Sequence, residues 1–373
     1  MKKPRILLDA NPVVPELVCG KINGIGRTCK ELINSLDTMA RELPFEIALY
    51  TQNVKGISAK RLGTGFKTIH TYLRNNNTGN RWSRRLHMRE ILGRYDLQHI
   101  THNYEQVVDP SRCIVTIHDV MFFSYPEKQV NPETNQKLIP PFVRKAKHIV
   151  TISENSKREI MQYMDVAEDR ITVIPWGIDH NLLYPRETSG NNYCGNSPYF
   201  ISVSCDTGRK NTISVVKAYA QFVANNPEHH LILVWRTPSR EALDLINKEG
   251  IADKVHFASN ISDNVLATLY AGATASFFPS MYEGFGLPIA ESMACGVPCI
   301  TCRNSSLEEV GGEAAIYVEP MDIDGMAKIM ENFENNSYDL DRLKAESLKQ
   351  AAKFTWDTCA RKTIDVYRKC LEL

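Results

Sequence analysis

The fold of this chain is constrained most by a regular alternation between short apolar runs and longer segments of helical period. Each apolar run is five or six residues long, and most are rich in Ile, Val or Phe. Strand-like runs that alternate with helical segments are typical of βαβ units, whose strands lie parallel in one sheet. The predicted strands cover residues 5–9, 45–50, 113–118, 148–153, 171–175, 199–204, 230–235, 254–258, 275–279 and 298–302. The sequence therefore predicts an α/β protein.

The alternation is interrupted at residues 184–198, where YPRETSGNNYCGNSP is rich in Gly, Asn, Ser and Pro. A chain of 373 residues exceeds the size at which one hydrophobic core keeps growing, so two domains are expected. We predict two Rossmann-like, doubly wound domains at residues 1–183 and 184–353, with their switch-point crevices at a shared cleft. The final segment, residues 354–373, is predicted to be a helix that packs back toward the N-terminal domain.

The charge balance argues against a bulk attraction to nucleic acid, because 44 basic and 43 acidic residues leave a formal net charge of +1. The charge is nevertheless uneven, since residues 55–94 contain ten Lys or Arg and one acidic residue. Within this region, GNRWSRRLHMREILGR (79–94) spaces Arg81, Arg85 and Arg89 at helical intervals beside apolar residues. Such a pattern is typical of a basic amphipathic helix that docks on an anionic membrane surface, and an ordinary solvated helix face is the alternative.

The N-terminal segment MKKPRILLDA has only a brief apolar run before Asp9, too short for a signal peptide, and no uncharged apolar stretch is long enough to span a bilayer. We therefore expect a cytoplasmic protein, peripheral at the inner face of the plasma membrane if residues 79–94 dock there. Its ten cysteines should then be reduced. Cys295, Cys299 and Cys302 form the tightest group, but no His or Cys pair elsewhere completes a zinc set. We interpret them as small buried hydrophobic residues and predict no metal.

The stretch PSMYEGFGLPIAESMACGVPCIT, residues 279–301, places Glu283 and Glu291 among glycine, proline and apolar residues. A helix is predicted to begin near Pro288, and the free amides of its first turn, together with the glycines before it, favour an anion such as phosphate. Carboxylates repel phosphate, so the two glutamates are better suited to accept hydrogen bonds from neutral hydroxyls of the same ligand. A sugar nucleotide, with a diphosphate between hydroxylated rings, fits both requirements. Alternatively, Glu283 caps the helix and Glu291 pairs with an arginine.

The segment EGFGLPIAE, with its glutamates spaced as E-x7-E, resembles the signature of the retaining glycosyltransferases of family four. The resemblance extends along most of the chain. Further matching segments are NGIGRT (23–28), TIHDV (116–120), TISENSKREI (151–160), IPWGID (174–179), SCDTGRKN (204–211) and SSLEEVGGEAAIYVEP (305–320). Enzymes of this family use nucleotide-sugar donors and have the GT-B fold, in which two Rossmann-like domains face an interdomain cleft. The resemblance therefore implies a hexosyltransferase with this fold.

The same resemblance implies a role for each residue of a donor site in the C-terminal half. Glu283 would hold hydroxyls of the donor sugar, and Glu291 would accept a hydrogen bond from the nucleotide ribose. Arg209 and Lys210 would neutralise the charge that builds on the leaving nucleoside diphosphate, in place of a divalent cation, so no metal or cofactor is expected. The backbone amides that would hold the diphosphate or the sugar are those of Gly284, Phe285, Gly286 and Leu287.

In the N-terminal half, His118 at the end of a predicted strand would contact the donor sugar or the leaving group. Its neighbour Asp119 either shares this role or only orients the loop. The amides of Gly24 and Gly26 would lie near the donor phosphate and the acceptor. Their segment, GIGRTC, is also a near match to the dinucleotide-binding pattern G-x-G-x-x-G, but it lacks the third glycine and an immediately preceding strand. An NAD-dependent oxidoreductase is therefore the weaker interpretation.

The RKN loop and the GIGR segment resemble bacterial polysaccharide mannosyltransferases, which makes GDP-mannose the first expected donor and UDP- or dTDP-sugars the next. The expected acceptor is a glycan or a polyprenyl-linked oligosaccharide in the biosynthesis of cell-surface polysaccharide, such as lipopolysaccharide. Trp235 follows a predicted strand and would either stack on the nucleotide base or be a core indole. Two other functions fit the same fold, namely a sugar-nucleotide-binding protein without turnover and a hydrolase of sugar nucleotides.

Overall fold

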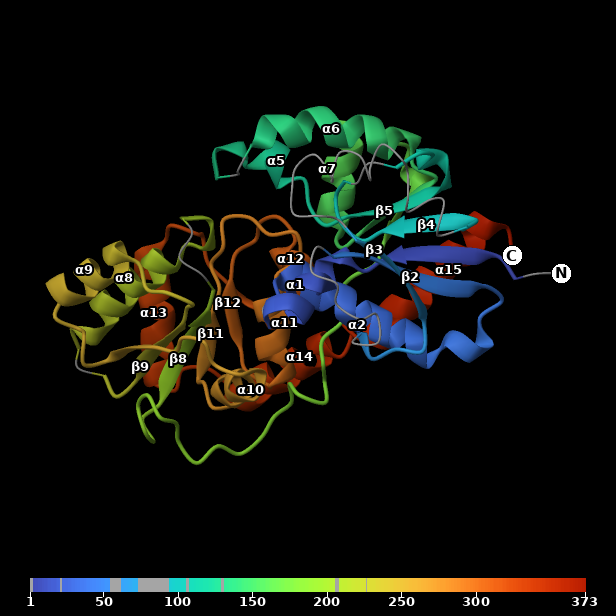
Figure 1. Ribbon diagram of the computed structural model, residues 1–373. Helices are drawn as coiled ribbons and strands as arrows, with labels where there is room; N and C mark the ends of the chain where they lie inside the picture. Colours follow the sequence, from blue (N-terminus) through green and yellow to red (C-terminus); the bar gives the residue numbers. More distant parts are fainter. Residues whose placement is uncertain are drawn as a thin grey trace. The chain divides into compact units, whose positions relative to one another are not determined.

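The computed structural model describes residues 3–20, 22–53, 62–72, 94–104, 107–128, 131–204, 208–225 and 227–373. The chain forms two compact units, drawn in Figure 1. Unit 1 comprises residues 1–177 and 356–373, and unit 2 comprises residues 178–355. Residues 79–93, which carry most of the predicted amphipathic helix, lie outside the described part of the chain.

A parallel sheet forms the centre of unit 1. Among the described residues it has seven strands in the order β3-β2-β1-β4-β5-β6-β7. The strands are β1 (Arg5–Asp9), β2 (Glu46–Asn53), β3 (Lys67–Tyr72), β4 (Leu97–Ile100), β5 (Cys113–Ile117), β6 (His148–Thr151) and β7 (Ile171–Val173). The direction of winding reverses between the neighbours β1 and β4. Such a reversal is the switch point at which doubly wound proteins bind ligands, beside the carboxyl ends of the strands.

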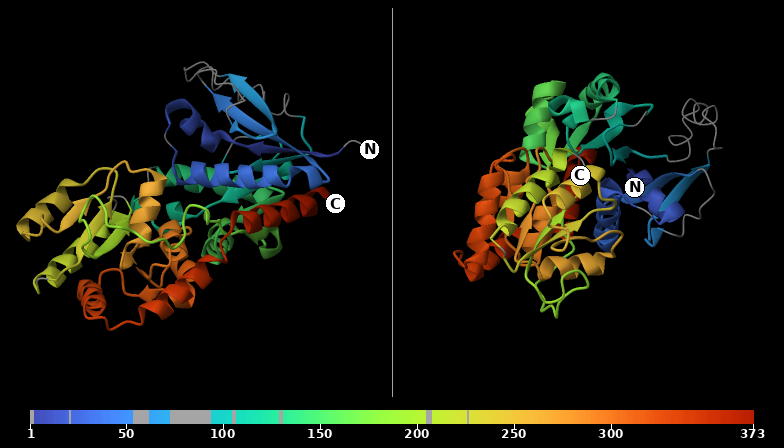
Figure 2. Two further views of the ribbon diagram at one scale, coloured as in Figure 1. Left: turned by 90° about the horizontal axis from the view of Figure 1, so that it is seen from below. Right: turned by 90° about the vertical axis from the view of Figure 1, so that its left-hand side faces the viewer.

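Helices cover both faces of this sheet. The longer ones are α2 (Gly24–Thr38), α6 (Pro132–Lys145), α7 (Glu154–Met164) and α15 (Trp356–Leu371), and the shorter ones are η1 (Asn11–Val13), α1 (Val14–Cys19), η2 (Ala40–Glu42), η4 (Pro110–Arg112), α5 (Met121–Ser124), η5 (Pro126–Lys128) and η6 (Glu168–Arg170). Successive strand residues point to opposite faces, so Ile6 and Leu8 of β1 pack with α2 and α15, which lie side by side in Figure 2. Val115 and Ile117 of β5 face α6 and α7. Burial on both faces explains the continuous apolar runs in the sequence.

Unit 2 is built in the same way around a second parallel sheet. Its six strands among the described residues run in the order β10-β9-β8-β11-β12-β13, with the reversal between β8 and β11. The strands are β8 (Tyr199–Val203), β9 (His230–Val234), β10 (Val255–Phe257), β11 (Ala275–Phe277), β12 (Cys299–Thr301) and β13 (Ile316–Tyr317). The loops that follow β8 and β11 therefore begin side by side at one edge of the sheet.

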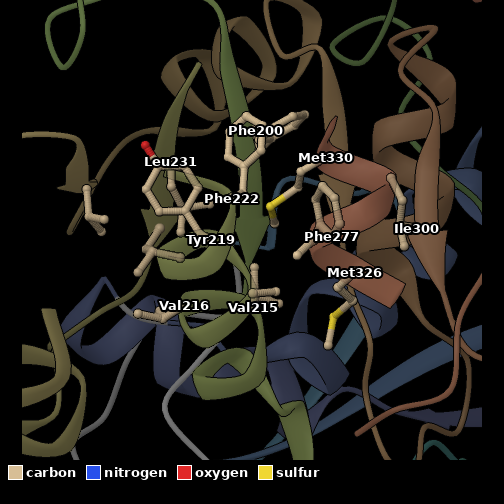
Figure 3. Close-up of a cluster of buried hydrophobic side chains, with 14 of the residues drawn as sticks. Phe200, Val215, Val216, Tyr219, Phe222, Leu231, Phe277, Ile300, Met326 and Met330 are labelled. Atoms are coloured by element: carbon tan, nitrogen blue, oxygen red, sulfur yellow. The ribbon is translucent and has the colours of Figure 1, made fainter. Parts of the chain in front are cut away.

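The helices of unit 2 are η7 (Gly208–Lys210), α8 (Thr212–Val223), α9 (Arg240–Lys248), α10 (Asp263–Ala271), α11 (Leu287–Ala294), α12 (Leu307–Gly311), η8 (Gly312–Ala314), α13 (Ile323–Glu334) and α14 (Leu340–Ala351). One face of the sheet packs against α8, α9 and α13. Figure 3 shows the centre of this core, where Phe200 of β8 lies among Phe222, Phe277 and Met330. The Phe200 and Phe277 rings meet edge to face, with centroids 5.4 Å apart.

Side-chain capping fixes where many of the helices begin. Each capping oxygen accepts a hydrogen bond from a first-turn amide that has no partner within the helix. The capping residues are Asn23 for α2, Ser153 for α7, Ser239 for α9, Ser262 for α10, Asp322 for α13 and Asp339 for α14. None of the described helices has the length and apolar character that crossing a membrane requires.

Every predicted strand is present, although several end earlier than expected, and β3, β4 and β13 were not predicted. The unit boundaries also differ from the predicted ones at 183/184 and 353/354, because they lie at 177/178 and 355/356. The Ile178 amide donates to the Phe354 carbonyl at 3.1 Å, and Ile178 pairs with Thr355 in a parallel bridge. These contacts make both connecting segments part of unit 2. The C-terminal helix α15 belongs to unit 1 and buries Ile364 and Tyr367 there.

Candidate active site

Two loops converge at the switch point of unit 2. The first follows β8 and contains Arg209 and Lys210, and the second follows β11 and contains Glu283. They are joined directly, since the Met281 amide donates to the Arg209 carbonyl at 2.8 Å. Ser280 Oγ lies 3.1 Å from the same carbonyl oxygen. The fold thus brings together residues that are more than seventy positions apart in the chain.

At this junction the Glu283 carboxylate binds two cations. Its Oε1 lies 2.6 Å from Lys210 Nζ, 2.8 Å from Arg209 Nη1 and 2.8 Å from Ser280 Oγ. Arg209 Nη1 also donates to the Tyr282 carbonyl at 2.6 Å. Burial by itself would raise the pKa of Glu283, but Lys210 and Arg209 outweigh burial and hold the pKa below its usual value. Glu283 is therefore ionised at neutral pH and pairs with both cations. The N-cap of α11 is Gly286 and no side chain caps this helix, so the alternative in which Glu283 caps it is wrong.

A short segment after β12 holds the backbone of Glu283. The Glu283 amide donates to Ser305 Oγ at 3.0 Å, and Ser306 Oγ lies 2.9 Å from the carbonyl oxygens of both Glu283 and Phe285. Asn304 Nδ2 donates to the Ser280 carbonyl at 3.2 Å. Ser305 has a φ of +46°, an unfavourable value for a residue with a Cβ. We call Asn304–Ser306 the serine clamp. Sequence reasoning missed it, although its position just after a buried strand was a usable signal.

The glycine loop leads into α11, which begins at Leu287 with Pro288 in its first turn. Gly286 has a φ of +106°, and a Cβ there would meet Leu307 Cδ2 at 3.0 Å and Ile289 Cδ1 at 3.2 Å. Glycine is therefore required at this position, both for the backbone angle and for the space. Phe285 is buried and packs edge-on to Phe354, with ring centroids 5.5 Å apart. The loop from Gly284 to Leu287 is thus rigidly placed at the positive end of α11.

Glu291 lies on α11 and is half-buried. The Tyr270 phenol donates a hydrogen bond to Glu291 Oε2 at 3.3 Å. Tyr270 is fully buried, and burial raises its pKa well above the usual value, with the charge of Glu291 adding to the effect. The phenol therefore keeps its proton and orients the carboxylate as an acceptor.

In unit 1, His118 follows β5 beside the switch point. Its Nε2 donates to the Thr101 carbonyl at 3.0 Å, and its amide donates to Asn103 Oδ1 at 3.1 Å. The ring packs against Trp176, with centroids 5.3 Å apart. Burial lowers the pKa of His118 to about 4, so the ring is neutral. Because the carbonyl requires the proton on Nε2, Nδ1 is an acceptor, and among the described residues it has no hydrogen-bond partner.

Residues that sequence reasoning missed surround His118. A cavity of about 30 Å³ adjoins it, lined in part by Thr28, His99, Thr101 and Thr116. Asp9, at the carboxyl end of β1, is fully buried, and its Oδ2 lies 3.2 Å from His102 Nδ1. The signal in the sequence was the position of Asp9, a carboxylate that ends an apolar strand.

Two sequence-based assignments in unit 1 concern backbone geometry. Asp119 Oδ1 accepts a hydrogen bond from the Met121 amide at 3.0 Å, which fits the interpretation that this residue orients the loop. The Gly26 amide, expected near the donor phosphate, instead donates to the capping Asn23 Oδ1 at 2.8 Å. A Cβ at Gly26 would lie 2.4 Å from the Pro12 carbonyl oxygen, so close packing explains this glycine. Gly24 begins α2 and is exposed.

Trp235 is a core indole rather than a platform for a nucleotide base. It is 1% exposed and packs against Phe257, with centroids 5.6 Å apart. Cys295, Cys299 and Cys302 are also buried, and burial raises each thiol pKa to about 12, as expected for small hydrophobic residues.

Comparison with known families decides what kind of protein has these two switch-point sites. The family described as "Glycosyltransferase Family 4" matches residues 22–182, and "Glycosyl transferases group 1" matches residues 188–353. The chain belongs to glycosyltransferase family 4. This family membership excludes the NAD-dependent oxidoreductase.

Two bacterial proteins with similar sequences are named as mannosyltransferases. The chain is 30% identical to "O-antigen chain mannosyltransferase B" of Escherichia coli over 69% of its own length and 70% of that protein. It is 31% identical to "MMP alpha-(1->4)-mannosyltransferase" of Mycolicibacterium hassiacum over 61% of its length, a match that spans only 55% of the relative. Among solved structures, sucrose-phosphate synthase from Thermosynechococcus elongatus has the same GT-B fold, with a TM-score of 0.77, 18% identity, and coverage of 99% of this chain and 100% of that one.

Proposed function

We propose that this glycosyltransferase transfers mannose, with retention of configuration, from GDP-mannose to a glycan or polyprenyl-linked oligosaccharide in the biosynthesis of cell-surface polysaccharide. The observation that carries the proposal is the convergence of Arg209, Lys210 and Glu283 at the switch point of unit 2. Two bacterial relatives are named as mannosyltransferases, which supports mannose as the transferred sugar.

The two cations are suited to the diphosphate of the donor. Negative charge grows on the leaving diphosphate as the bond to the sugar breaks, and fixed cations stabilise that charge more in the transition state than in the ground state. Arg209 and Lys210 are mostly buried, with side chains 19% and 15% exposed, so water screens them less than it would on the surface. On this proposal the protein's own cations supply the neutralisation, and no metal or other cofactor is required.

The carboxylates are suited to hydroxyls. All three contacts of Glu283 described above are to Oε1, so Oε2 is the oxygen that would accept a hydrogen bond from the donor sugar. Glu291, oriented by Tyr270, would accept from the ribose. The amides at the start of α11 would hold the diphosphate or the sugar. His118 would accept a sugar hydroxyl at Nδ1, because its tautomer is fixed by the Thr101 carbonyl.

The test is turnover by the purified protein with GDP-mannose, UDP-sugars and dTDP-sugars, measured as release of nucleoside diphosphate with and without a polysaccharide-derived acceptor. The proposal expects release from GDP-mannose that depends on the acceptor. Acceptor-independent release would identify a hydrolase, and binding without release would identify a sugar-nucleotide-binding protein. A preference for UDP- or dTDP-sugars would overturn the assignment of the donor.

We also propose that the protein is cytoplasmic and docks on an anionic membrane surface through residues 79–94. The proposal is based on the helical spacing of Arg81, Arg85 and Arg89 in the sequence. Each cation near an anionic membrane surface contributes about 1 kcal/mol to binding. Flotation with vesicles of phosphatidylcholine and phosphatidylglycerol tests this. We expect binding that weakens when the three arginines are changed to glutamate, and binding unaffected by these changes or by moderate salt would refute it.

A further inference from the structure

The Glu283 carboxylate is paired with Arg209 and Lys210, the two cations that would bind the donor diphosphate. Lys210 Nζ and Arg209 Nη1 both lie within 2.8 Å of one carboxylate oxygen, and the Glu283 side chain is only 10% exposed. The cations are therefore already neutralised by an anion of the protein itself. An entering diphosphate has to share these cations with the carboxylate or displace it.

Sharing is unfavourable, because two anions that bind the same cations repel one another in a site with little water. Displacement is favourable only if the carboxylate finds other hydrogen-bond donors. An intact nucleotide sugar brings such donors, namely the hydroxyls of its sugar. After transfer, the nucleoside diphosphate no longer carries the sugar hydroxyls that could replace the cations as partners of Glu283.

We propose that Glu283 is an internal competitor of the diphosphate, displaced by the donor and driving release of the product. This inference rests on the proposed function, and it gives the carboxylate two sets of partners. With the donor bound, Glu283 accepts from sugar hydroxyls and leaves Arg209 and Lys210 to the diphosphate. Once the sugar has been transferred, Glu283 returns to the cations and weakens the hold on the nucleoside diphosphate.

The surroundings are arranged for such an exchange. The serine clamp holds the backbone of Glu283 through neutral hydrogen bonds that a ligand does not disturb, so only the side chain has to move. Arg209 keeps its bond to the Tyr282 carbonyl, and Lys210 Nζ remains 5.0 Å from the centre of the Phe278 ring. Both cations thus retain a partner when the carboxylate leaves.

The test compares the parent protein with Glu283→Gln in calorimetric titrations with inorganic pyrophosphate, which has neither sugar nor base, and with GDP and UDP. We expect pyrophosphate to bind at least about tenfold more tightly to Glu283→Gln, because the competing charge is gone. The control is Glu313→Gln, which makes the same change in net charge at an exposed position of unit 2 and should leave binding unchanged. In a Lys210→Met background the gain should shrink, since one of the contested cations is missing.

Thermal melts separate competition from a purely structural role. Removing the carboxylate leaves two largely buried cations without their anionic partner, so Glu283→Gln should melt below the parent without ligand and recover most of that loss with saturating pyrophosphate. If the variant does not fold, Glu283→Asp keeps the charge but shortens the side chain, and should still bind pyrophosphate more tightly than the parent. A variant that binds pyrophosphate as the parent does, or more weakly, overturns the inference. A parent that binds neither GDP nor UDP refutes the proposed function instead.

Discussion

Removal of the Ser306 hydroxyl should lower both the stability of the protein and the kcat of the molecules that remain folded. Ser306 is fully buried, and its Oγ lies 2.9 Å from the carbonyl oxygens of both Glu283 and Phe285. In Ser306→Ala these carbonyls lose their shared donor, which should cost about 1–3 kcal/mol of unfolding free energy. In a domain of this size that loss lowers the melting temperature by roughly 2–4 °C per kcal/mol.

Turnover by the folded variant should fall as well, because the same hydroxyl fixes the loop from which the Glu283 carboxylate projects. We expect kcat to fall about tenfold or more, since a small misplacement of a group near the reacting atoms is costly. The matched control is Thr301→Val, which removes an equally buried hydroxyl that donates to the Phe278 carbonyl at 2.9 Å but does not touch Glu283. Thermal melts and steady-state kinetics on both variants are the assay. Equal losses of kcat in Ser306→Ala and Thr301→Val would refute a positioning role for the clamp.

Three further predictions concern side-chain charge. Arg209→Ala and Lys210→Ala should lower kcat far more than they lower the melting temperature, and turnover equal to the parent would remove both residues from the mechanism. Glu291→Ala should mainly raise the donor KM, whereas Glu283→Ala should mainly lower kcat, and exchanged profiles in well-folded variants would contradict these roles. Burial lowers the pKa of His99 to about 3, so the unfolded state binds more protons than the folded state below about pH 6.5. Stability should therefore fall as the pH drops from about 6.5 toward 4, by up to about 1.4 kcal/mol per pH unit for this group, and denaturant melts of His99→Gln should show a shallower slope.

The strands that could be predicted from the sequence are those with a continuous apolar run, as in β8 and β11. β4 escaped prediction because two of its four residues, Gln98 and His99, are polar although both are buried. His99 is tolerated there because its two ring nitrogens lie 2.7 Å from the Tyr367 hydroxyl and 2.8 Å from Thr116 Oγ1. Tyr367 comes from the distant helix α15, so only the completed fold supplies the partner that makes burial of His99 favourable.

The candidate site, too, could be predicted from the sequence only in part. Arg209, Lys210 and Glu283 could be selected from the sequence because the segments that carry them, SCDTGRKN and EGFGLPIAE, resemble segments of family four. The direct pairing of the two cations with Glu283 could not be predicted, because no local spacing relates residue 209 to residue 283. The hydrogen bond from the Gly26 amide to the Asn23 cap could not be predicted either, because it depends on where α2 begins.

The two glutamates of the signature differ in what holds them, and that difference underlies their separate kinetic roles. Glu291 projects from a regular helix and accepts from Tyr270, whose raised pKa keeps the phenol protonated, so this carboxylate is oriented before any ligand arrives. Glu283 has a backbone fixed by neutral hydrogen bonds but a carboxylate held mainly by charges that an anionic ligand replaces. A preoriented acceptor contributes equally to ground-state and transition-state binding and therefore appears in KM. An acceptor that must exchange partners as the diphosphate gains and loses its sugar contributes unequally along the reaction, and its loss therefore appears in kcat.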